Sequence, residues 1–415
     1  MYQSPRGTTD ILPEDQHYWF FLENKIIEIT SRYGYGRIET PVFEDSSLYT
    51  RTTGEYTDIV QKEMYTFEDR GGNKLSLRPE GTPSVCRAYI QHGFQIKPQP
   101  VKLYYLTSIF RYDRPQAGRW RQHHQFGCEA IGDADPALDV EIIEIAWRLC
   151  QSTGLQNISI QLNSIGCREC RPKYLAVLTG HYRGNEKTLC TDCKIRLVNN
   201  PLRLLDCKQP QCQSLANSAP RSADYLCEEC REHLKQVEEY LSLLELPYEL
   251  NPRLVRGLDY YSKTVFEIQP DDDRAQATIG GGGRYDYLIE ELGGKPTPGV
   301  GFATGIERII LNMKKQHIEV PPLSSPTILV AYIGAEAKKK AVRLTSDLRK
   351  FGLSVVNAAS GKSLKAQLKQ ANTLGVLYTV ILGDEEVKNG TAVLRNMTNA
   401  SQETVMVNNL KDLLK

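Results

Sequence analysis

The sequence predicts an α+β protein: a first domain built on an antiparallel sheet carries a helical, cysteine-rich insertion, and a smaller α/β domain follows it. Strand-like runs at 101–111 and 122–131 flank a polar loop, as the two arms of an antiparallel hairpin do. From about 166 to 246 the sequence becomes rich in Cys and Arg. Pro and Ser residues at 321–326 then form a linker before alternating apolar and helix-like segments.

These shifts set the domain boundaries at 1–325, which includes the insertion, and 326–415. A chain of 415 residues, 40% hydrophobic and 24% charged, is long enough for two or three domains with their own cores. Residues 1–7 lack the basic patch and apolar run of a signal peptide, and no segment approaches the roughly 20 apolar residues that span a bilayer. We expect a soluble, cytoplasmic protein without a membrane partner.

The first elements follow from periodicity and from helix and strand breakers. From 18 to 33, apolar and aromatic residues recur at three- and four-residue steps, which predicts an amphipathic helix that stops at Gly34. Residues 37–43 predict a strand broken by Pro41, which cannot donate to a ladder. The hairpin comes next along the chain.

The sheet is expected to continue on both sides of the insertion. Residues 158–163 form a short strand-like run, and 264–268 form another after it. Four consecutive glycines at 280–283 suit a strand that another backbone or a ligand approaches closely. Residues 328–332 are expected to be the first strand of the second domain.

Charge is unevenly distributed along the chain. The net charge is only +1, which argues against a chain-wide surface for polyanions. Residues 326–415, however, hold 13 Lys and Arg against 7 Asp and Glu, so the basic part is the C-terminal part. There, Lys362, Lys365 and Lys369 recur at helical spacing and are expected to share one helix face.

The most informative motif is Arg256-Gly257-Leu258-Asp259-Tyr260-Tyr261, which combines a cation, a glycine and two phenols. Alone it fits an ordinary strand end with a solvated arginine and packed tyrosines. Four further segments accompany it, at 78–82, 110–115, 122–129 and 301–308. Together they resemble the class II aminoacyl-tRNA synthetases over nearly the whole chain. The hexapeptide and residues 78–82 resemble the histidyl-tRNA synthetases among them.

This resemblance implies an activity and its partners. L-histidine and ATP, with Mg²⁺, would give histidyl-adenylate and pyrophosphate, and the adenylate would then charge histidine tRNA. The resemblance also implies a homodimer with 37–43 at its interface, and an anticodon-binding role for 326–415. Because the chain has no G-x-x-x-x-G-K-[ST] loop, arginine forks must hold the phosphates.

The resemblance assigns these arginines. Arg111 would contact the α-phosphate and the amino-acid carboxylate, Arg308 would hold the γ-phosphate, and Arg121 would also bind ATP. Arg256 would lie on the other side of the α-phosphate, where related synthetases rely on a metal ion. Arg256 and Arg111 are therefore the expected catalytic residues, because they stabilise charge that develops in the transition state.

The amino-acid pocket is assigned in the same way. The expected histidine-binding residues are Glu80, Gly81, Thr82, Gln125, Glu129, Tyr260 and Tyr261. Acceptors on Glu80, Thr82 and Gln125 would surround the α-ammonium, and Glu129 and Tyr261 would pair with the two imidazole nitrogens. Such buried polar partners reject analogues that leave them unpaired by roughly 10⁴-fold.

Two features concern the neighbourhood of this pocket. Antiparallel pairing of the hairpin is expected to bring Arg111 near Gln125 and Glu129. Tyr287 and His123 depart from the family pattern, and neither is expected to touch the assigned residues.

Two regions are candidates for RNA contact. The hairpin loop mixes basic and aromatic residues, and because the motif frames it, Gln116 and Arg119 are expected to contact a single-stranded RNA end rather than form a solvated tip. The likeness of the tail to an anticodon reader likewise favours RNA contact at Lys362, Lys365 and Lys369 over a solvated stripe.

Eight of the eleven cysteines lie in the insertion, as four closely spaced pairs. The pairs are Cys167 and Cys170, Cys190 and Cys193, Cys207 and Cys212, and Cys227 and Cys230. Four such pairs can form two tetrahedral four-sulfur zinc sites, whereas disulfides are disfavoured in a reduced cytosol. The alternative is that these thiols are small buried hydrophobes. The spacing favours structural zinc but leaves open which pairs share an ion.

Two other functions compete with charging of tRNA. A non-catalytic paralogue, similar to the regulatory subunit of ATP phosphoribosyltransferase, keeps the fold but binds another protein. Such paralogues generally lack the C-terminal domain and an intact hexapeptide, and this chain has both. A zinc-dependent nucleic-acid-binding protein with relic motifs is the second rival, and the retention of every arginine and carboxylate named above speaks against it.

Overall fold

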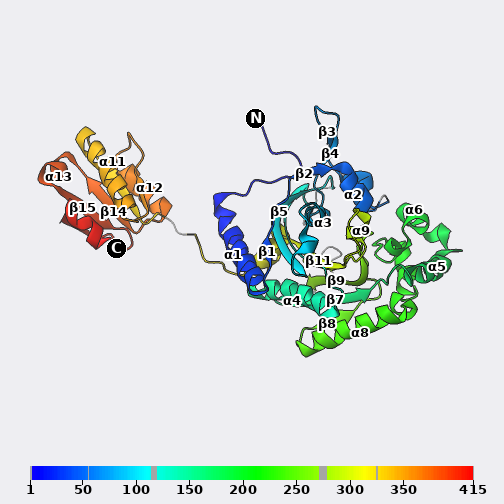
Figure 1. Cartoon of the computed structure of the whole chain (residues 1–415). Helices are drawn as coiled ribbons and strands as arrows, with labels where there is room; N and C mark the ends of the chain where they lie inside the picture. Colours follow the sequence, from blue (N-terminus) through cyan, green and yellow to red (C-terminus); the bar gives the residue numbers. More distant parts are fainter. Residues whose placement is uncertain (1, 55, 114–118, 271–277, 324–325, 415) are drawn as a thin grey trace. The chain divides into compact units, whose positions relative to one another are not determined.

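A computed structural model describes residues 2–54, 56–113, 119–270, 278–323 and 326–414. The chain forms two compact units, Met1–Pro321 and Pro322–Lys415 (Figure 1). Across the described ranges, no helix combines the length and apolar character needed to cross a membrane.

The first unit is built on an eight-stranded sheet of order β1-β5-β6-β11-β10-β9-β7-β8. The strands are β1 (Gly36–Arg37), β5 (Val101–Phe110), β6 (Gln122–Ile131), β7 (Ile158–Ser164), β8 (Tyr248–Leu250), β9 (Ser262–Pro270), β10 (Gly280–Arg284) and β11 (Gly299–Gly305). All pairs from β5 to β7 are antiparallel, and only the outermost strands β1 and β8 pair in parallel. The predicted antiparallel sheet is confirmed.

The predicted hairpin is β5 and β6, and its register orders the side chains along the sheet. Thr107 pairs with Gln125 and Leu103 with Glu129, whereas the Arg111 N–H donates to the Arg121 carbonyl beyond the last strand pair. Arg111 therefore lies at the open end of the hairpin and Glu129 lies deeper in the sheet, so the expectation that pairing brings Arg111 near Glu129 is wrong.

The glycine strand β10 lies between β9 and β11 with almost no room for side chains. A Cβ added to Gly282 would lie 2.0 Å from the Gly301 carbonyl oxygen, and one added to Gly281 would lie 2.8 Å from Nη1 of Arg256. The predicted close approach of a backbone to this strand is confirmed, and the strand also approaches a functional arginine.

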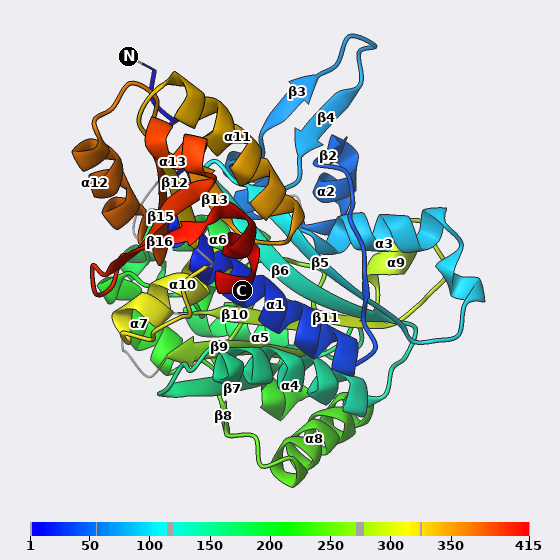
Figure 2. The same ribbon diagram turned by 90° about the vertical axis from the view of Figure 1, so that its left-hand side faces the viewer.

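Helices α1 (Gln16–Arg32), α4 (Pro136–Ser152), α8 (Glu228–Leu243) and α10 (Ile306–Lys315) supply the main apolar core against one face of this sheet (Figure 2). The predicted helix at 18–33 is α1. A buried ion pair crosses this core: Arg284 of β10 contacts Asp139 of α4, and His233 of α8 contacts the same carboxylate at 3.2 Å.

The prediction of one strand over 37–43 is wrong in part. Gly36–Arg37 joins β5, whereas β2 (Phe43–Asp45) belongs to a separate three-stranded antiparallel sheet with β4 (Lys74–Leu77) and β3 (Thr66–Glu68). The carbonyls of Thr40 and Pro41, between the two strands, accept hydrogen bonds from the Arg78 guanidinium at 2.7 and 3.2 Å. Between the two strands, the Arg78 side chain therefore supplies the hydrogen bonds that a neighbouring strand would otherwise provide.

Short helices and the insertion complete the first unit. The short helices are α2 (Ser46–Thr52), α3 (Thr82–Gln91) and α9 (Leu288–Glu291). The insertion is helical, as predicted, with α5 (Arg171–Tyr182), α6 (Thr191–Asn199) and α7 (Pro210–Asn217) before α8. Helix α8 packs against α4 and so attaches the insertion to the core of the unit.

The second unit is an α/β domain around the sheet β13-β12-β14-β15-β16. Its elements are β12 (Ile328–Tyr332), α11 (Ala335–Lys350), β13 (Val355–Asn357), α12 (Leu364–Leu374), β14 (Tyr378–Leu382), α13 (Asp384–Asn389), β15 (Thr391–Asn396), β16 (Gln402–Met406) and α14 (Leu410–Leu413). Alternate residues of β12 belong to two apolar clusters, one shared with α11 and one with α12, so helices cover both faces.

The predicted lysine stripe is only partly helical. Lys365 and Lys369 are exposed on α12, but Ser363 is the N-cap of that helix and Lys362 precedes it. The Ser363 hydroxyl accepts from the Ala366 N–H, so the helix starts at Leu364, two residues after Lys362.

Candidate active site

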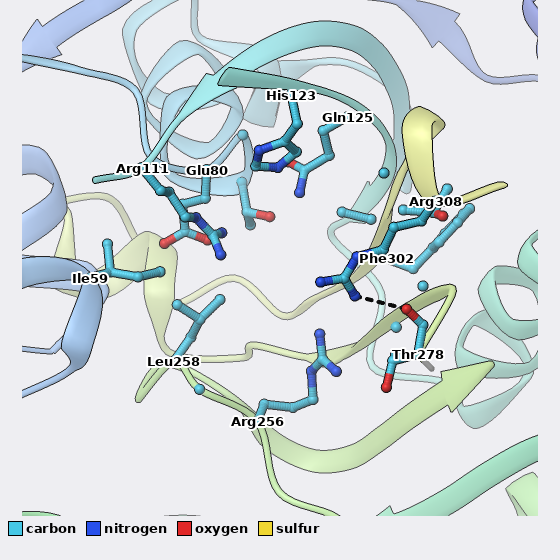
Figure 3. Close-up of a pocket in the computed structure, with 18 of the residues that line it drawn as sticks. Ile59, Glu80, Arg111, His123, Gln125, Arg256, Leu258, Thr278, Phe302 and Arg308 are labelled. Carbon is cyan, nitrogen blue, oxygen red and sulfur yellow. Dashed lines mark hydrogen bonds between the residues drawn. The ribbon is translucent and has the colours of Figure 1, made fainter. Parts of the chain in front are cut away.

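A cavity of about 410 Å³ opens in the first unit among β6, β10, β11 and the loop before β9. The guanidinium groups of Arg111, Arg256 and Arg308 point into the same open space (Figure 3). They come from the hairpin, the hexapeptide and α10, three segments far apart in the sequence. Such a convergence of cations forms a site for an anion.

Backbone carbonyls hold two of these arginines in place. Nε of Arg111 donates to the Pro79 carbonyl at 2.7 Å, and Nη1 of Arg308 donates to the Thr278 carbonyl at 2.8 Å. Burial and the neighbouring Arg111 lower the pKa of Arg308. A bound anion would relieve this repulsion.

Arg256 forms an ion pair with Glu267 of β9. The second Glu267 oxygen accepts from Thr278 at 2.9 Å, so the carboxylate is held from both sides. Burial lowers the pKa of Arg256, but Glu267 and Tyr261 outweigh it and hold that pKa above its ordinary value. Nε of Arg256 is buried without a hydrogen-bond partner among the described residues, as expected of a donor that a ligand satisfies.

Two acceptors belong to the predicted ammonium pocket. Glu80 is buried and accepts from Thr53 at 2.8 Å and from the Tyr260 hydroxyl at 2.7 Å. Burial raises the pKa of Glu80, although both hydrogen bonds oppose the rise. Gln125 lines the cavity, and its buried Oε1 has no hydrogen-bond partner in the described part of the chain. An ammonium group would satisfy both acceptors.

Glu129 lies behind the cavity wall and is fully buried. Its oxygens accept from the Thr82 and Tyr285 hydroxyls, each at 2.6 Å, and from Tyr105 at 3.4 Å. Burial raises the pKa of Glu129 to about 8, so without a ligand this carboxyl is largely protonated at neutral pH. A Cβ on Gly301 would lie 1.9 Å from its Oε2, so only glycine leaves room there.

Ten of the predicted site residues line the cavity: Glu80, Gly81, Thr82, Arg111, Arg119, Gln125, Arg256, Tyr260, Tyr261 and Arg308. Arg121 does not line it; its guanidinium stacks 3.8 Å from the centre of the Tyr112 ring, and its Nε donates to the Asp113 carbonyl. Gln116 lies outside the described residues.

The sequence reasoning missed four residues that shape the cavity. Glu267 pairs with Arg256, and Tyr105 and Tyr285 bind Glu129. Arg203 lines the cavity from the insertion. A search for a carboxylate to balance Arg256 could have found Glu267, which lies in the next predicted strand.

His123, one of the two departures, also lines the cavity. Burial, with the nearby Arg111 and Arg308, lowers its pKa to about 3, so the imidazole is neutral at physiological pH. It adds no further positive charge. Tyr287 lies elsewhere and stacks with the Arg168 guanidinium, 4.0 Å from the ring centre.

The eight insertion cysteines gather in two clusters. The first cluster is Cys167, Cys170, Cys227 and Cys230, and the second is Cys190, Cys193, Cys207 and Cys212. Within each, all four Sγ atoms lie within 4.8 Å of one another, and four of the sulfur–sulfur distances are 3.7 to 3.9 Å. A tetrahedron with Zn–S bonds of about 2.3 Å has sulfur–sulfur edges of about 3.8 Å. The donor sets therefore fit zinc.

The antiparallel sheet and its arginine-lined cavity define the fold of a class II aminoacyl-tRNA synthetase. The family model for histidyl-tRNA synthetase matches residues 7–169 and 202–309, and the model for an anticodon-binding domain matches 327–415. The chain belongs to the histidyl-tRNA synthetase family. Residues 170–201, in the insertion, lie outside the match.

Individual relatives agree with this assignment. A histidine–tRNA ligase of Dehalococcoides mccartyi is 61% identical over 99% of this chain and 98% of its own length. One of Desulforamulus reducens is 48% identical over 99% and 98%. The crystal structure of apo S. aureus histidyl-tRNA synthetase superposes with a TM-score of 0.83 at 38% identity, covering 100% of this chain and 99% of that one.

Proposed function

We propose that this protein attaches L-histidine to histidine tRNA through a histidyl-adenylate. One observation carries the proposal: three arginines converge on a cavity that the buried carboxyl group of Glu80 lines, and the buried carboxyl group of Glu129 lies directly behind its wall. The arginines suit a polyphosphate, and the carboxyl groups suit a small cationic amino acid. Full-length similarity to histidine–tRNA ligases supports the same activity and does not support the regulatory-subunit alternative.

In the first step, a carboxylate oxygen of histidine attacks the α-phosphorus of ATP and pyrophosphate leaves. Arg111 and Arg256 reach the cavity from different segments and would bind the α-phosphate from two sides. Fixed charges of this kind stabilise the transition state because they need no rearrangement as charge develops. Arg308 would hold the γ-phosphate. Mg²⁺ would enter with ATP, and the oxygens of Glu267 and Glu307 on the cavity wall are of the type it prefers.

Histidine would be recognised at both ends. Glu80, Thr82 and Gln125 would accept from its α-ammonium, while Glu129 and Tyr261 would pair with the imidazole. Because Glu129 is largely neutral in the empty cavity, its carboxyl group can donate to one ring nitrogen or accept from it, as the tautomer requires.

In the second step, the terminal hydroxyl of the tRNA attacks the adenylate carbonyl. We assign catalysis to residues 1–325 and anticodon binding to 326–415. Arg119, paired with Asp113 at 3.1 Å beside the cavity, would contact the acceptor end. Lys365 and Lys369 would contact tRNA phosphates.

We also propose a homodimer. Val42, Phe43 and Phe67 are 45, 51 and 42% exposed on or beside the three-stranded sheet, and the two phenylalanine rings contact each other edge to face. Burial against a second copy would remove this apolar surface from water. Sedimentation of the native protein is expected to give twice the chain mass of 46.9 kDa.

The insertion is proposed to hold two structural Zn²⁺ ions, one in each cysteine cluster. A cytoplasmic location is part of the proposal, because the thiols stay reduced there.

Aminoacylation tests the proposal directly. Purified protein, ATP, Mg²⁺ and bacterial tRNA are incubated with each labelled amino acid in turn. Incorporation of histidine alone is expected. Failure to charge any tRNA, in folded protein with intact thiols, would favour the regulatory-subunit alternative.

A further inference from the structure

The hexapeptide that carries Arg256 lies in a loop, residues 251–261, between β8 and β9. This loop contains neither helix nor strand, although it supplies Arg256, Tyr260 and Tyr261 to the cavity. A backbone ladder therefore does not fix the positions of these side chains. Two backbone hydrogen bonds tether the loop, from the Asn251 N–H to the Leu162 carbonyl and from the Asp259 N–H to the Thr53 carbonyl, and side-chain hydrogen bonds hold it elsewhere.

Glu267 and Glu80 hold Arg256 and Tyr260, and several further side-chain hydrogen bonds to the loop come from the insertion. Nδ2 of Asn200 donates to the Asp259 carboxylate at 2.7 Å. The Arg171 guanidinium donates to the Tyr261 carbonyl. Arg253, inside the loop, donates to the Leu205 carbonyl at 3.2 Å. The insertion thus contacts the loop at three positions, Arg253, Asp259 and Tyr261.

Each contact comes from a segment that cluster cysteines begin or bracket. Arg171 directly follows Cys170 of the first cluster. Asn200 and Leu205 lie in the 13-residue segment between Cys193 and Cys207 of the second. That segment also carries Arg203, whose Nη1 lies 3.2 Å from the position of a Cβ on Gly257. The geometry of each cluster therefore determines the backbone positions of Arg171, Asn200 and Leu205.

Charge at the first cluster points to a bound metal. The Arg171 guanidinium donates to the carbonyls of Ile165 at 3.2 Å and Gly166 at 3.1 Å, besides Tyr261. No carboxylate of the described residues forms an ion pair with it. Burial lowers the pKa of Arg171, and although the nearby Asp259 carboxylate opposes this shift, the hydrogen bonds of the guanidinium to described residues go to neutral carbonyls. Zn²⁺ with four thiolates carries a net charge of −2, which would add negative charge beside this partly buried cation.

Hydrogen bonds to sulfur also suit thiolates. The Cys167 N–H donates to Sγ of Cys170 at 3.3 Å. In the second cluster, the N–H groups of Cys190 and Cys193 donate to sulfur at 3.4 Å each. Both clusters thus present donors that stabilise negative sulfur.

We propose that Zn²⁺ bound in the two clusters fixes the 251–261 loop through Arg171 and Asn200, and that histidine activation therefore depends on this metal. The inference rests on the proposed function, since activation supplies one of its readouts. Arg171 and Asn200 are positioning residues: they touch the loop, and the loop touches the substrates.

Metal content tests whether the two clusters bind Zn²⁺, without any measurement of activity. The full chain, purified without chelator, is expected to contain two Zn²⁺ per chain by elemental analysis. After exchange, Co²⁺ is expected to give the intense thiolate charge-transfer absorption of tetrahedral sulfur sites. Fewer than two ions per chain, with all eight thiols free to react, would overturn the proposal.

The Asn200→Ala variant tests whether Asn200 positions the 251–261 loop for histidine activation. It is expected to keep two zinc ions and the wild-type Tm, yet to raise the KM for histidine in pyrophosphate exchange about tenfold, in line with loss of one charge-assisted hydrogen bond. Asn200→Asp keeps the size of the side chain but cannot donate at neutral pH, so it is expected to fail in the same way. The matched control is Asn199→Ala, the exposed neighbour, which is expected to behave as wild type.

Wild-type kinetics in Asn200→Ala would overturn the positioning role. Removal of zinc by a chelator gives the complementary result: exchange is expected to fall at least tenfold and to return when Zn²⁺ is restored. Exchange that survives in metal-free, folded protein would refute this inference and leave the proposed function intact. Absence of exchange in metal-replete wild type would instead refute the proposed function.

Discussion

At the scale of single residues, the site combines paired and unpaired polar atoms. Arg256 is held by Glu267 but keeps a buried Nε without a partner in the described structure, and Gln125 keeps a buried acceptor in the same state. Atoms of this kind cost free energy in the empty protein and gain partners when ligands bind. We infer that part of the fold's stability is given up to prepare the cavity for its substrates.

The buried carboxyl group of Glu129 makes the free energy of unfolding depend on pH. Its pKa is about 8 in the folded protein against an ordinary value of 4.5, so the folded state holds an extra proton between these values. The stabilisation from this proton is complete below about pH 4.5 and is lost as the pH rises to about 8. Wild type is therefore expected to lose stability relative to Glu129→Gln across this window, by at most about 1.4 kcal/mol per pH unit.

Urea unfolding of both proteins at pH 5.5, 6.5 and 7.5, followed by tryptophan fluorescence, measures this difference. All three tryptophans, Trp19, Trp120 and Trp147, lie in the first unit, so the probe reports on the unit that holds Glu129. Parallel pH profiles for the two proteins would show that Glu129 does not carry the extra proton.

At the scale of elements, local patterns predicted much of the sheet. The hairpin and the glycine strand could be predicted from the sequence because strand-like apolar runs and glycine runs are signals contained within a few consecutive residues. The break between Gly36–Arg37 and β2 could not, because it depends on Arg78 from a distant segment. The partition of the cysteines into two clusters could not be read either, since spacing leaves the pairing open and only the folded insertion brings Cys167 near Cys227.

Site residues follow the same division. The arginines of the cavity were predicted because they lie in motifs, whereas Glu267 and Arg203 were missed because neither belongs to one. Lys362 was placed on a helix face by spacing alone, but the Ser363 N-cap starts the helix after it. The expected place of Arg121 in ATP binding stays a prediction, and its guanidinium stacks on Tyr112 instead of lining the cavity.

The glycine strand gives a prediction at this scale. Gly282→Ala would bring a Cβ within 2.0 Å of the Gly301 oxygen and 2.6 Å of the Phe302 Cα, so the backbone of β11 must shift. We expect a loss of about 1–3 kcal/mol or more, seen as a lower Tm. Gly180→Ala in α5 meets nothing within 4 Å and is expected to raise stability by up to about 1 kcal/mol. Equal Tm values for the two variants would contradict this account of β10.

At the scale of the whole molecule, each of the two folded units has its own proposed role. The first has the cavity and both cysteine clusters, and the second carries the excess of basic residues. Under the proposed function, activation of histidine would use only the first unit, whereas charging would also require the second unit to hold the tRNA. The two activities can therefore be separated by mutation.

A double variant of Lys365 and Lys369 to Ala tests this division. We expect a several-fold higher KM for tRNA and a salt dependence of binding that is weaker by about 1.5 in logarithmic slope, because two phosphate contacts are lost. Pyrophosphate exchange without tRNA is expected to stay unchanged. The control changes Lys339 and Lys350, exposed on α11, to Ala. An equal effect of both double variants would point to net charge rather than to a binding face on α12.

The most direct test of the central claim is histidine-dependent exchange of labelled pyrophosphate into ATP, without tRNA, in wild type and in Arg256→Ala. Wild type is expected to exchange strongly. The variant is expected to lose about 10²- to 10³-fold in rate, as for loss of one fixed donor that stabilises a transition state. Equal exchange in the two proteins would contradict the role of Arg256, and no exchange in folded, metal-replete wild type would contradict the assignment of this cavity to histidine activation.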